Sequence, residues 1–399
     1  MSFIKTVRIV TAYVIMTGFP FAAYASGDNI GYGDTDQPGT ESLAERVFQI
    51  EKKQNAFNVY LNFSGAGGVE AGGGEGKTGF KCRQLRLEIK GNITDRLYYR
   101  LRHRLNKANY AAGEDNFAKA TDYMMVGYRF NDRWSVQFGK MCQVWGGYEF
   151  DANPIYIYKY SDMTDNLDSP KAGLVVSYKP VSSQELVVEI SNSRNESLET
   201  SFPGIENQGF KDTRAPLAYI FNWNGSFFEG DKLQTRWSWG WRTLAEDTYS
   251  RQMILGQRLS LPKFQCYLDY SYEADDIDRM GIITREAKHL LPVGCSHFQK
   301  TDYHSFVAKA DWQFANQWNA FLQGMYETAS VRKGIDALKD YRKHYSYFAG
   351  VEYFPDLSQD LRITLTYLGQ TFSYTDRSGL DGHSESRIEL GMIYRLKCF

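Results

Sequence analysis

The sequence has few cysteines, no excess of charge and no long apolar run beyond its first 25 residues. Its five cysteines are an odd number scattered over 399 residues, which is not the pattern of a disulfide framework. Basic and acidic residues balance at 46 and 47, so nothing favours a chain-wide nucleic-acid binder. No later apolar run approaches the roughly 18 residues of a membrane helix, which excludes an α-helical membrane protein.

The sequence also lacks the short motifs of common enzyme sites. It contains no nucleophile elbow, no phosphate-cradling glycine loop and no HExxH motif. His289, Cys295 and His297 lie close together, but no second cluster of ligands accompanies them. We expect polar loop residues there rather than a metal site. We therefore expect no enzyme activity, no cofactor and no metal.

The first 25 residues have the features of an export signal. The basic residues Lys5 and Arg8 precede a short apolar stretch that ends at the small residues Ala23 and Ala25. We predict a signal peptide over residues 1–25. A retained membrane anchor is the alternative, and the short apolar stretch with its cleavage site argues against it.

The mature chain shows a regular alternation of apolar and polar residues. A period of two is the period of a β-strand, because successive side chains point to opposite faces. Many of the alternating segments approach the 9 to 11 or so residues of a tilted transmembrane strand, whereas globular strands average about five or six. The sixteen predicted strands span residues 57–63, 80–90, 96–106, 120–130, 134–143, 172–179, 184–192, 216–225, 232–242, 251–260, 263–273, 302–314, 317–328, 343–354, 360–372 and 385–399.

The connections between these segments are alternately short and long. Residues 91–95 and 131–133 are short, while 107–119 and 144–171 are long, and the glycine-rich tract 65–79 is expected to be another long loop. Bacterial outer-membrane barrels have short turns at one end and long loops at the other. In hydrocarbon only helices or closed barrels satisfy every backbone polar group. We predict an all-β fold, a 16-stranded antiparallel transmembrane β-barrel over residues 57–399. A soluble sandwich or propeller is less favoured, because no blade-length repeat is visible.

The segment ahead of the barrel is different. Residues 26–42 are rich in Gly, Asp and Thr, which predicts a flexible lead-in. Residues 43–56 predict a short periplasmic coiled-coil helix that joins three barrels, and a lone amphipathic helix against the barrel is almost equally favoured. The heptad positions that support the coiled coil are Leu43, Val47, Ile50, Gln54 and Phe57.

The polar residues of the alternating strands, which would face the inside of a barrel, are rich in arginine and lysine. A barrel would therefore have a basic interior. Rows of Arg and Lys line anion pores, and guanidinium groups bind phosphate oxygens in a bidentate fork. The alternative is that these cations pair with inward carboxylates, although only Glu88 lies close in the first strands. The predicted pore-lining and anion-binding residues are Arg86, Lys90, Arg96, Arg100, Arg102, Arg104, Arg129, Arg236 and Arg242.

The loop after the fifth strand is rich in aromatic residues and too apolar to extend into water. We expect it to fold into the bore and narrow it. The candidate constriction residues are Tyr156, Tyr158, Lys159 and Lys171.

Several segments resemble one known family. They are residues 43–63, Arg86 to Asp95, Tyr99 to Lys107, Gly139 to Gly147, Asn153 to Ile155, and Tyr160 to Asp162. The sequence of these segments resembles the Bacteroidetes branch of the phosphate-selective porin O and P family. The resemblance implies a trimeric 16-stranded porin in the outer membrane of a Gram-negative bacterium. It also implies passive diffusion of phosphate-like anions along arginines, with lysines from inward loops narrowing the path.

The sequence thus predicts a diffusion channel for small anions, with outer-membrane lipid, the permeating anions and two further copies of the chain as partners. No nucleic-acid partner is expected. A weakly selective general porin and a non-conducting surface or adhesin barrel remain as alternatives. A lipid-hydrolysing barrel would need Ser, His and Asp side chains on its outer face. The alternation predicts one histidine on that face, His103.

Overall fold

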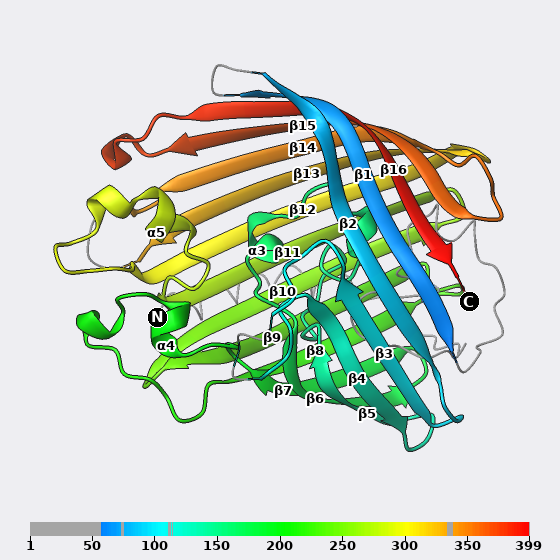
Figure 1. Cartoon of the computed structure of the whole chain (residues 1–399), viewed down its shortest axis with the longest axis horizontal. Coiled ribbons are helices and arrows are strands. Elements are labelled where there is room, and N and C mark those ends of the chain that lie inside the picture. Colours follow the sequence, from blue (N-terminus) through cyan, green and yellow to red (C-terminus); the bar gives the residue numbers. More distant parts are fainter. Residues whose placement is uncertain (1–56, 73–75, 111–112, 114, 333–337, 399) are drawn as a thin grey trace.

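The computed structural model describes residues 57–72, 76–110, 113, 115–332 and 338–398. Sixteen antiparallel strands form a closed barrel in which each strand pairs with its neighbours in sequence and β1 pairs with β16 (Figure 1). The predicted fold and strand number are confirmed. The predicted signal peptide, lead-in and coiled-coil helix lie outside the described residues.

The observed strands lie close to the predicted segments. Most boundaries differ by a few residues, and the largest differences are extensions at the ends that carry the long loops. The strands are β1 (Asn58–Gly72), β2 (Lys77–Asn92), β3 (Leu97–Arg104), β4 (Thr121–Arg129), β5 (Trp134–Met141), β6 (Lys171–Val181), β7 (Gln184–Asn192), β8 (Leu217–Phe227), β9 (Leu233–Ala245), β10 (Thr248–Leu261), β11 (Phe264–Ile277), β12 (Gln299–Ala315), β13 (Trp318–Val331), β14 (Arg342–Tyr353), β15 (Asp360–Tyr374) and β16 (His383–Lys397).

The side-chain alternation divides each strand between the two faces of the wall. In β15, Leu365 is 51% exposed on the outer face, while Thr364 and Thr366 on either side are buried. In β16 the outward Leu390 pairs with Leu365. The outer face is therefore apolar and fits hydrocarbon, whereas the inner face carries the polar and charged residues.

The glycine-rich tract is an exception to the prediction. We expected residues 65–79 to form a loop, but β1 stays paired with β16 as far as Gly72. A Cβ at Gly68 would meet the backbone oxygen of Ile388 at 2.4 Å, and one at Gly67 would meet the ring of Phe80 at 2.6 Å. Glycine is needed here for close packing between strands, and it also removes the alternation by which a strand is recognised.

Seven connections at one end of the barrel, all within the described residues, are only two to six residues long, and the wholly described connections at the other end are longer with one exception. The exception is the β9–β10 connection, which consists of Glu246 and Asp247 alone. The longer loops carry the short helices η1 (Pro154–Tyr156), α3 (Asp162–Asp165), α4 (Leu198–Ser201), η2 (Glu206–Gln208), α5 (Ile282–Glu286), η3 (Lys288–Leu290) and η5 (Asp376–Ser378). None of these described helices has the length and apolar character needed to cross a membrane.

The two long loops on either side of the short β9–β10 turn are joined to each other. The side-chain oxygen of Gln208, in the β7–β8 loop, accepts hydrogen bonds from the backbone N–H groups of Ser296 and His297, both at 2.9 Å, in the β11–β12 loop. The Gln208 amide also donates to the His297 carbonyl at 3.1 Å. We call these two joined loops, residues 193–216 and 278–298, the strap.

Aromatic pairs on the outer face mark the end of the barrel that has the short turns. Trp134 stacks on Tyr178 with ring centroids 4.4 Å apart, and Trp318 lies 4.7 Å from Tyr353. Trp and Tyr side chains prefer the boundary between lipid tails and head groups. These pairs therefore fit an interfacial girdle at the short-turn end.

The apolar outer face can be tested with a charge at one outward position. Leu365→Arg places a cation where the wall meets hydrocarbon, so we expect a loss of about 2–4 kcal/mol of folding free energy if the site lies near the bilayer midplane. Reversible urea unfolding in phospholipid vesicles measures it. Leu365→Val is the matched control and should retain most of the stability. Equal stabilities for the two variants would contradict the outward assignment.

Candidate functional site

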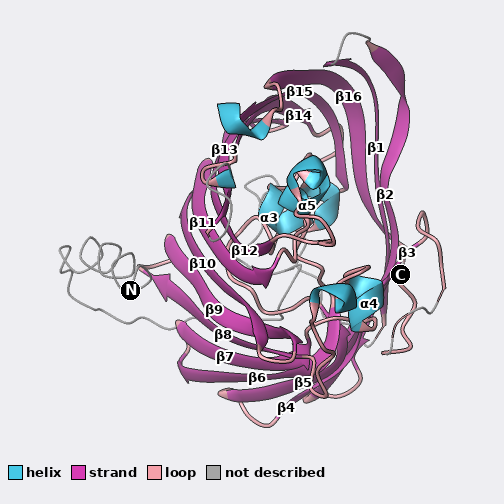
Figure 2. Ribbon diagram, turned by 90° about the vertical axis from the view of Figure 1, so that its left-hand side faces the viewer, coloured by secondary structure: helices cyan, strands magenta, loops and turns pink. Residues whose placement is uncertain are grey.

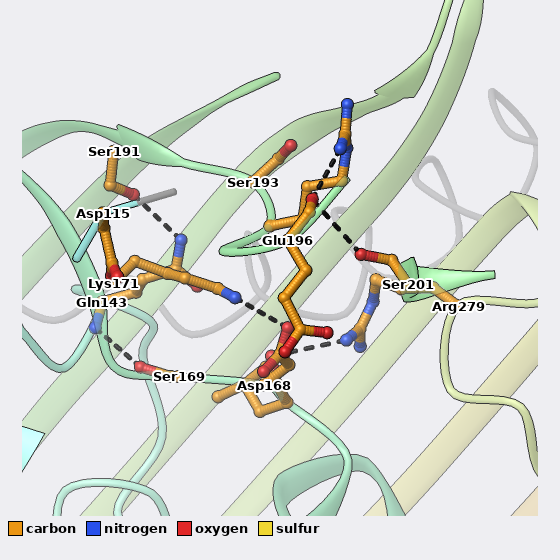
Figure 3. A network of polar contacts seen from close by, with 12 residues as sticks. Asp115, Gln143, Asp168, Ser169, Lys171, Ser191, Ser193, Glu196, Ser201 and Arg279 are labelled. Atoms are coloured by element: carbon orange, nitrogen blue, oxygen red, sulfur yellow. Dashed lines mark hydrogen bonds and ion pairs between the residues drawn. The ribbon is translucent and has the colours of Figure 1, made fainter. Parts of the chain in front are cut away.

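The connection between β5 and β6 folds back into the barrel, and we call residues 142–170 the inward loop. Its two ends are fastened to each other (Figure 3). The backbone N–H of Gln143 donates to the Ser169 hydroxyl at 2.9 Å. Close by, the Lys171 ammonium lies 2.7 Å from the Asp168 carboxylate. The neck of the loop is thus closed, and the loop enters the bore as a compact unit.

The first half of the inward loop is held against β9 to β11. One carboxylate oxygen of Asp269 accepts hydrogen bonds from the backbone N–H groups of Tyr148 and Glu149, at 2.7 and 2.8 Å. Asp151 forms a buried ion pair with Arg236. Arg236 was predicted to line the pore, but it is buried and anchors the inward loop.

The second half of the inward loop contains the one-turn helix α3, which lies inside the ring of strands (Figure 2). Ser161 caps this helix by accepting a hydrogen bond from the Thr164 N–H. The backbone N–H of Asp162, at the start of the helix, donates to the Glu327 carboxylate of β13 at 2.8 Å. The Asp162 carboxylate pairs with Arg342 of β14 at 2.5 Å. The helix is therefore fixed to β13 and β14.

One buried carboxyl group holds the inward loop together internally. Glu149 accepts hydrogen bonds from the Ser161 N–H at 2.8 Å, the Ser161 hydroxyl at 2.5 Å and the Thr164 hydroxyl at 2.7 Å. Burial raises the pKa of Glu149 to about 7, even though these hydrogen bonds favour the charged form. Glu149 thus changes its charge near neutral pH, in the middle of the loop.

The aromatic part of the inward loop packs on β13 to β16. The Tyr158 hydroxyl donates to Glu352 at 2.9 Å, and its ring stacks on Phe321 with centroids 4.7 Å apart. Tyr156 bonds through its hydroxyl to Asp360. Both tyrosines were predicted to face the constriction, and their hydroxyl groups are instead bonded to the wall.

The two predicted constriction lysines have different surroundings. Lys171 is the first residue of β6, is 2% exposed and pairs with Asp168, so it fastens the neck of the loop. Lys159 is half-buried in the loop, and no ion pair joins it to a carboxylate among the described residues. Lys159 is therefore the lysine of this loop that best fits a constriction.

A cluster of arginines lies on the inner face of β2 and β3, and an acidic residue of β4 organises it. The Asp122 carboxylate lies 2.6 Å from Arg86, 3.2 Å from Arg102 and 2.7 Å from Arg104. The sequence analysis missed Asp122. The β3–β4 pairing shifts register between Arg102 and His103, so Asp122 and Tyr123 are both buried and the alternation fails at this point.

A second group of cations surrounds Glu88 on β2. Arg100 lies 2.7 Å from this carboxylate and Arg395 of β16 lies 3.6 Å from it. Lys90 and Arg395 both lie over the ring of Tyr60. Five basic side chains thus lie beside two carboxylates, with Lys90 next to them over Tyr60. We call this surface of β16, β1, β2, β3 and β4 the basic wall.

Three further predicted pore residues lie away from the basic wall. Arg96 is exposed in the β2–β3 turn, because β3 begins at Leu97, so its predicted place in the arginine row was wrong. Arg129 lies at the same end and donates to Asn92 at 3.1 Å. Arg242 is 1% exposed and lies over the ring of Trp145, beneath the inward loop. A strand pattern does not show which inward cations the loop covers.

The outer face carries one more histidine than predicted. His103 is half-buried on β3 and bonds to the Thr121 hydroxyl, and His304 of β12 lies on the outer face against Tyr270 and Tyr272. The adjacent Tyr303 and Ser305 are buried on the inner face.

The attachment of the inward loop can be tested at Asp269. Asp269→Ala removes the acceptor of two loop N–H groups, so we expect a looser loop, a higher single-channel conductance and larger current fluctuations in planar bilayers. Asp302→Ala is a matched control, because Asp302 lies on the outer face beside Tyr272. A conductance unchanged in both variants would show that the loop does not depend on this contact.

Solved structures with a similar fold are outer-membrane proteins. They include the outer membrane channel DcaP of Acinetobacter baumannii, with 10% identity and a TM-score of 0.59 over 85% of this chain and 97% of that one. A trimer form of OmpT of Vibrio cholerae has 11% identity and a TM-score of 0.53 over 86% and 100%. An anion-selective porin from Comamonas acidovorans has 8% identity and a TM-score of 0.53 over 86% and 100%.

The sequence comparisons agree with the fold. No curated protein sequence matches this chain. A family model described as phosphate-selective porin O and P matches residues 57–396, which is nearly the whole barrel. The chain therefore belongs to the phosphate-selective porin O and P family and is an outer-membrane porin.

Proposed function

We propose that this porin lets small anions diffuse passively along the basic wall. The observation that supports this most directly is that five basic side chains contact Asp122 or Glu88 and that Lys90 lies beside them over Tyr60. A surface with an excess of positive charge in a low-dielectric wall raises the local concentration of anions. The solute is carried without chemical change.

Two acidic residues of the inward loop are ion-paired with arginines of the wall, and this supports an anion preference. Asp151 pairs with Arg236, and Asp162 pairs with Arg342. Acids that are ion-paired against the wall contribute little field to the open part of the bore. Lys159 of the same loop adds a positive charge to the path.

The chemistry of the basic wall is suited to phosphate-like anions. Guanidinium groups form two parallel hydrogen bonds with phosphate oxygens, which a compact ammonium cannot do. Arg100 keeps 12% of its side chain exposed and Arg104 keeps 30%, and both lie on β3. We propose them as the first arginines that a phosphate-like solute meets. The family description points to the same class of solute.

We further propose that the mature protein acts as a homotrimer in the outer membrane after removal of residues 1–25. The trimer form of the structurally similar OmpT supports this assembly. A non-conducting adhesin barrel is the alternative, and it would give no single-channel current in a planar bilayer.

Removing two charges from the basic wall tests the anion preference. We expect Arg100→Ala combined with Arg102→Ala to lower the chloride-to-potassium permeability ratio several-fold, because two cations leave the bore. The measurement is the reversal potential in a salt gradient. Arg251→Ala is the matched control, since Arg251 lies on the outer face of β10 between the buried Ser250 and Gln252. An unchanged reversal potential in the double variant would contradict the proposal.

Removing an acid from the same wall should have the opposite effect. Asp122→Asn keeps the shape of the side chain but deletes the negative charge that Arg86, Arg102 and Arg104 share. We expect the anion preference to rise in the same reversal-potential measurement. Asp302→Asn, on the outer face, serves as control. A shift toward cations in Asp122→Asn would show that Asp122 acts by holding the arginines in place rather than by its charge.

A further inference from the structure

Three different ligand groups converge where the inward loop meets β13 and β14. They are Asp162 of α3, Glu327 of β13 and His344 of β14, and their ligand atoms all lie within 4.8 Å of one another. His344 Nδ1 is 2.9 Å from an Asp162 oxygen and 3.2 Å from Glu327 Oε2. His344 is 0% exposed and Glu327 is 2% exposed, so bulk water does not fill the space between them.

The surroundings of His344 orient its ring toward the two carboxylates. Nε2 lies 3.3 Å from Gln370 Oε1, which is an acceptor, and 2.9 Å from the Ser346 hydroxyl. The ring stacks on Phe372 with centroids 4.2 Å apart. A hydrogen on Nε2 leaves the Nδ1 lone pair directed at two carboxylate oxygens. Histidines that bind metals are held in this way, with the second ring nitrogen donating to a fixed acceptor.

The spacing of the three groups matches a coordination shell. Zinc binds imidazole nitrogen and carboxylate oxygen at about 2.0–2.2 Å, which places neighbouring ligand atoms about 2.8–3.6 Å apart in octahedral or tetrahedral geometry. The two separations from His344 Nδ1, 2.9 and 3.2 Å, lie within this range. One nitrogen and two oxygens are also a ligand set that borderline divalent ions accept.

Two further observations indicate that a cation belongs here. Glu327 Oε2 is buried, and its polar neighbour among the described residues is His344 Nδ1 at 3.2 Å, so it is left without a donor when Nδ1 carries no hydrogen. A buried acceptor left in that state costs about 1–3 kcal/mol, and more when it is charged. Arg342 supplies one positive charge, but it pairs with Glu286 at 3.2 Å as well as with Asp162. Arg342 thus pairs with two carboxylates, and Glu327 adds a third within 4.8 Å of the Asp162 ligand atom.

We propose that Asp162, Glu327 and His344 bind a divalent ion of the zinc type, which joins helix α3 of the inward loop to β13 and β14. Arg342 bonds to the Asp162 ligand from outside the shell. The ion crosslinks the loop to β13 and β14, and its ligands are not residues of the basic wall. It therefore sets how rigidly the loop is held, and the anion preference does not depend on it.

Calorimetry on the folded porin in detergent tests this site directly. After EDTA treatment and removal of the chelator, titration with zinc chloride should show a single ion bound per chain. His344→Ala and Glu327→Gln should each abolish that binding. His304→Ala is the matched control, because His304 lies on the outer face of β12, and it should bind zinc as the wild type does. Absence of binding in the wild type, or equal binding in His344→Ala, would overturn the proposal.

A second measurement avoids the risk that a variant fails to fold. Cobalt added to the wild-type protein should acquire the visible absorption of a protein-bound ion, and zinc should displace it. The spectrum of aqueous cobalt, unchanged by the protein, would refute the site. In planar bilayers, zinc should reduce the current fluctuations of the wild type and EDTA should restore them. If the fluctuations respond to pH and not to zinc, the imidazolium alone links the two carboxylates and the metal site is wrong.

Discussion

The need to pair every backbone N–H and C=O group inside hydrocarbon is the constraint on which this structure depends. A sheet with two open edges would leave a row of unpaired groups in the lipid, whereas a closed barrel leaves none. Here the closing contact joins the first strand to the last. β1 and β16 stay in register from Tyr60 with Lys397 to Gly72 with Glu385. The glycines of β1 let the two strands approach closely along this seam.

Closure creates an interior that side chains and one loop must fill without blocking the path. The inward loop meets this need with carboxylates and backbone N–H groups that pair with the wall of β9 to β14. Arginines such as Arg236 and Arg242 lie against the inward loop and take part in these contacts. The cations of β2 and β3 face a different neighbour, Asp122 or Glu88, and stay grouped. Arginine therefore has two roles in this barrel: it holds the inward loop, or it belongs to the basic wall. The position of the loop decides which role an inward arginine has.

Much of the fold could be predicted from the sequence, because lipid outside and water inside impose a period of two on every strand. The site was less predictable. Asp122 lies at a bulge, where the alternation fails, and half of the residues from Gly65 to Gly72 are glycines, so no alternation can be recognised there. The roles of Lys171 and Arg236 depend on partners far away in the chain, which periodicity does not reveal. Arg96 was misplaced because the boundary between strand and turn falls beside it.

The strap gives the short β9–β10 turn an unexpected importance. Glu246 and Asp247 form a surface hairpin of the kind that usually accepts extra residues with little effect. The β7–β8 loop packs on Leu244 and Ala245 at this hairpin, and its Lys211 carbonyl accepts a hydrogen bond from the Glu246 N–H at 2.9 Å, so a longer turn would displace these contacts. A larger hairpin at this point would therefore have to break contacts of the strap. The shortness of one turn thus preserves the shape of an entrance built by two others.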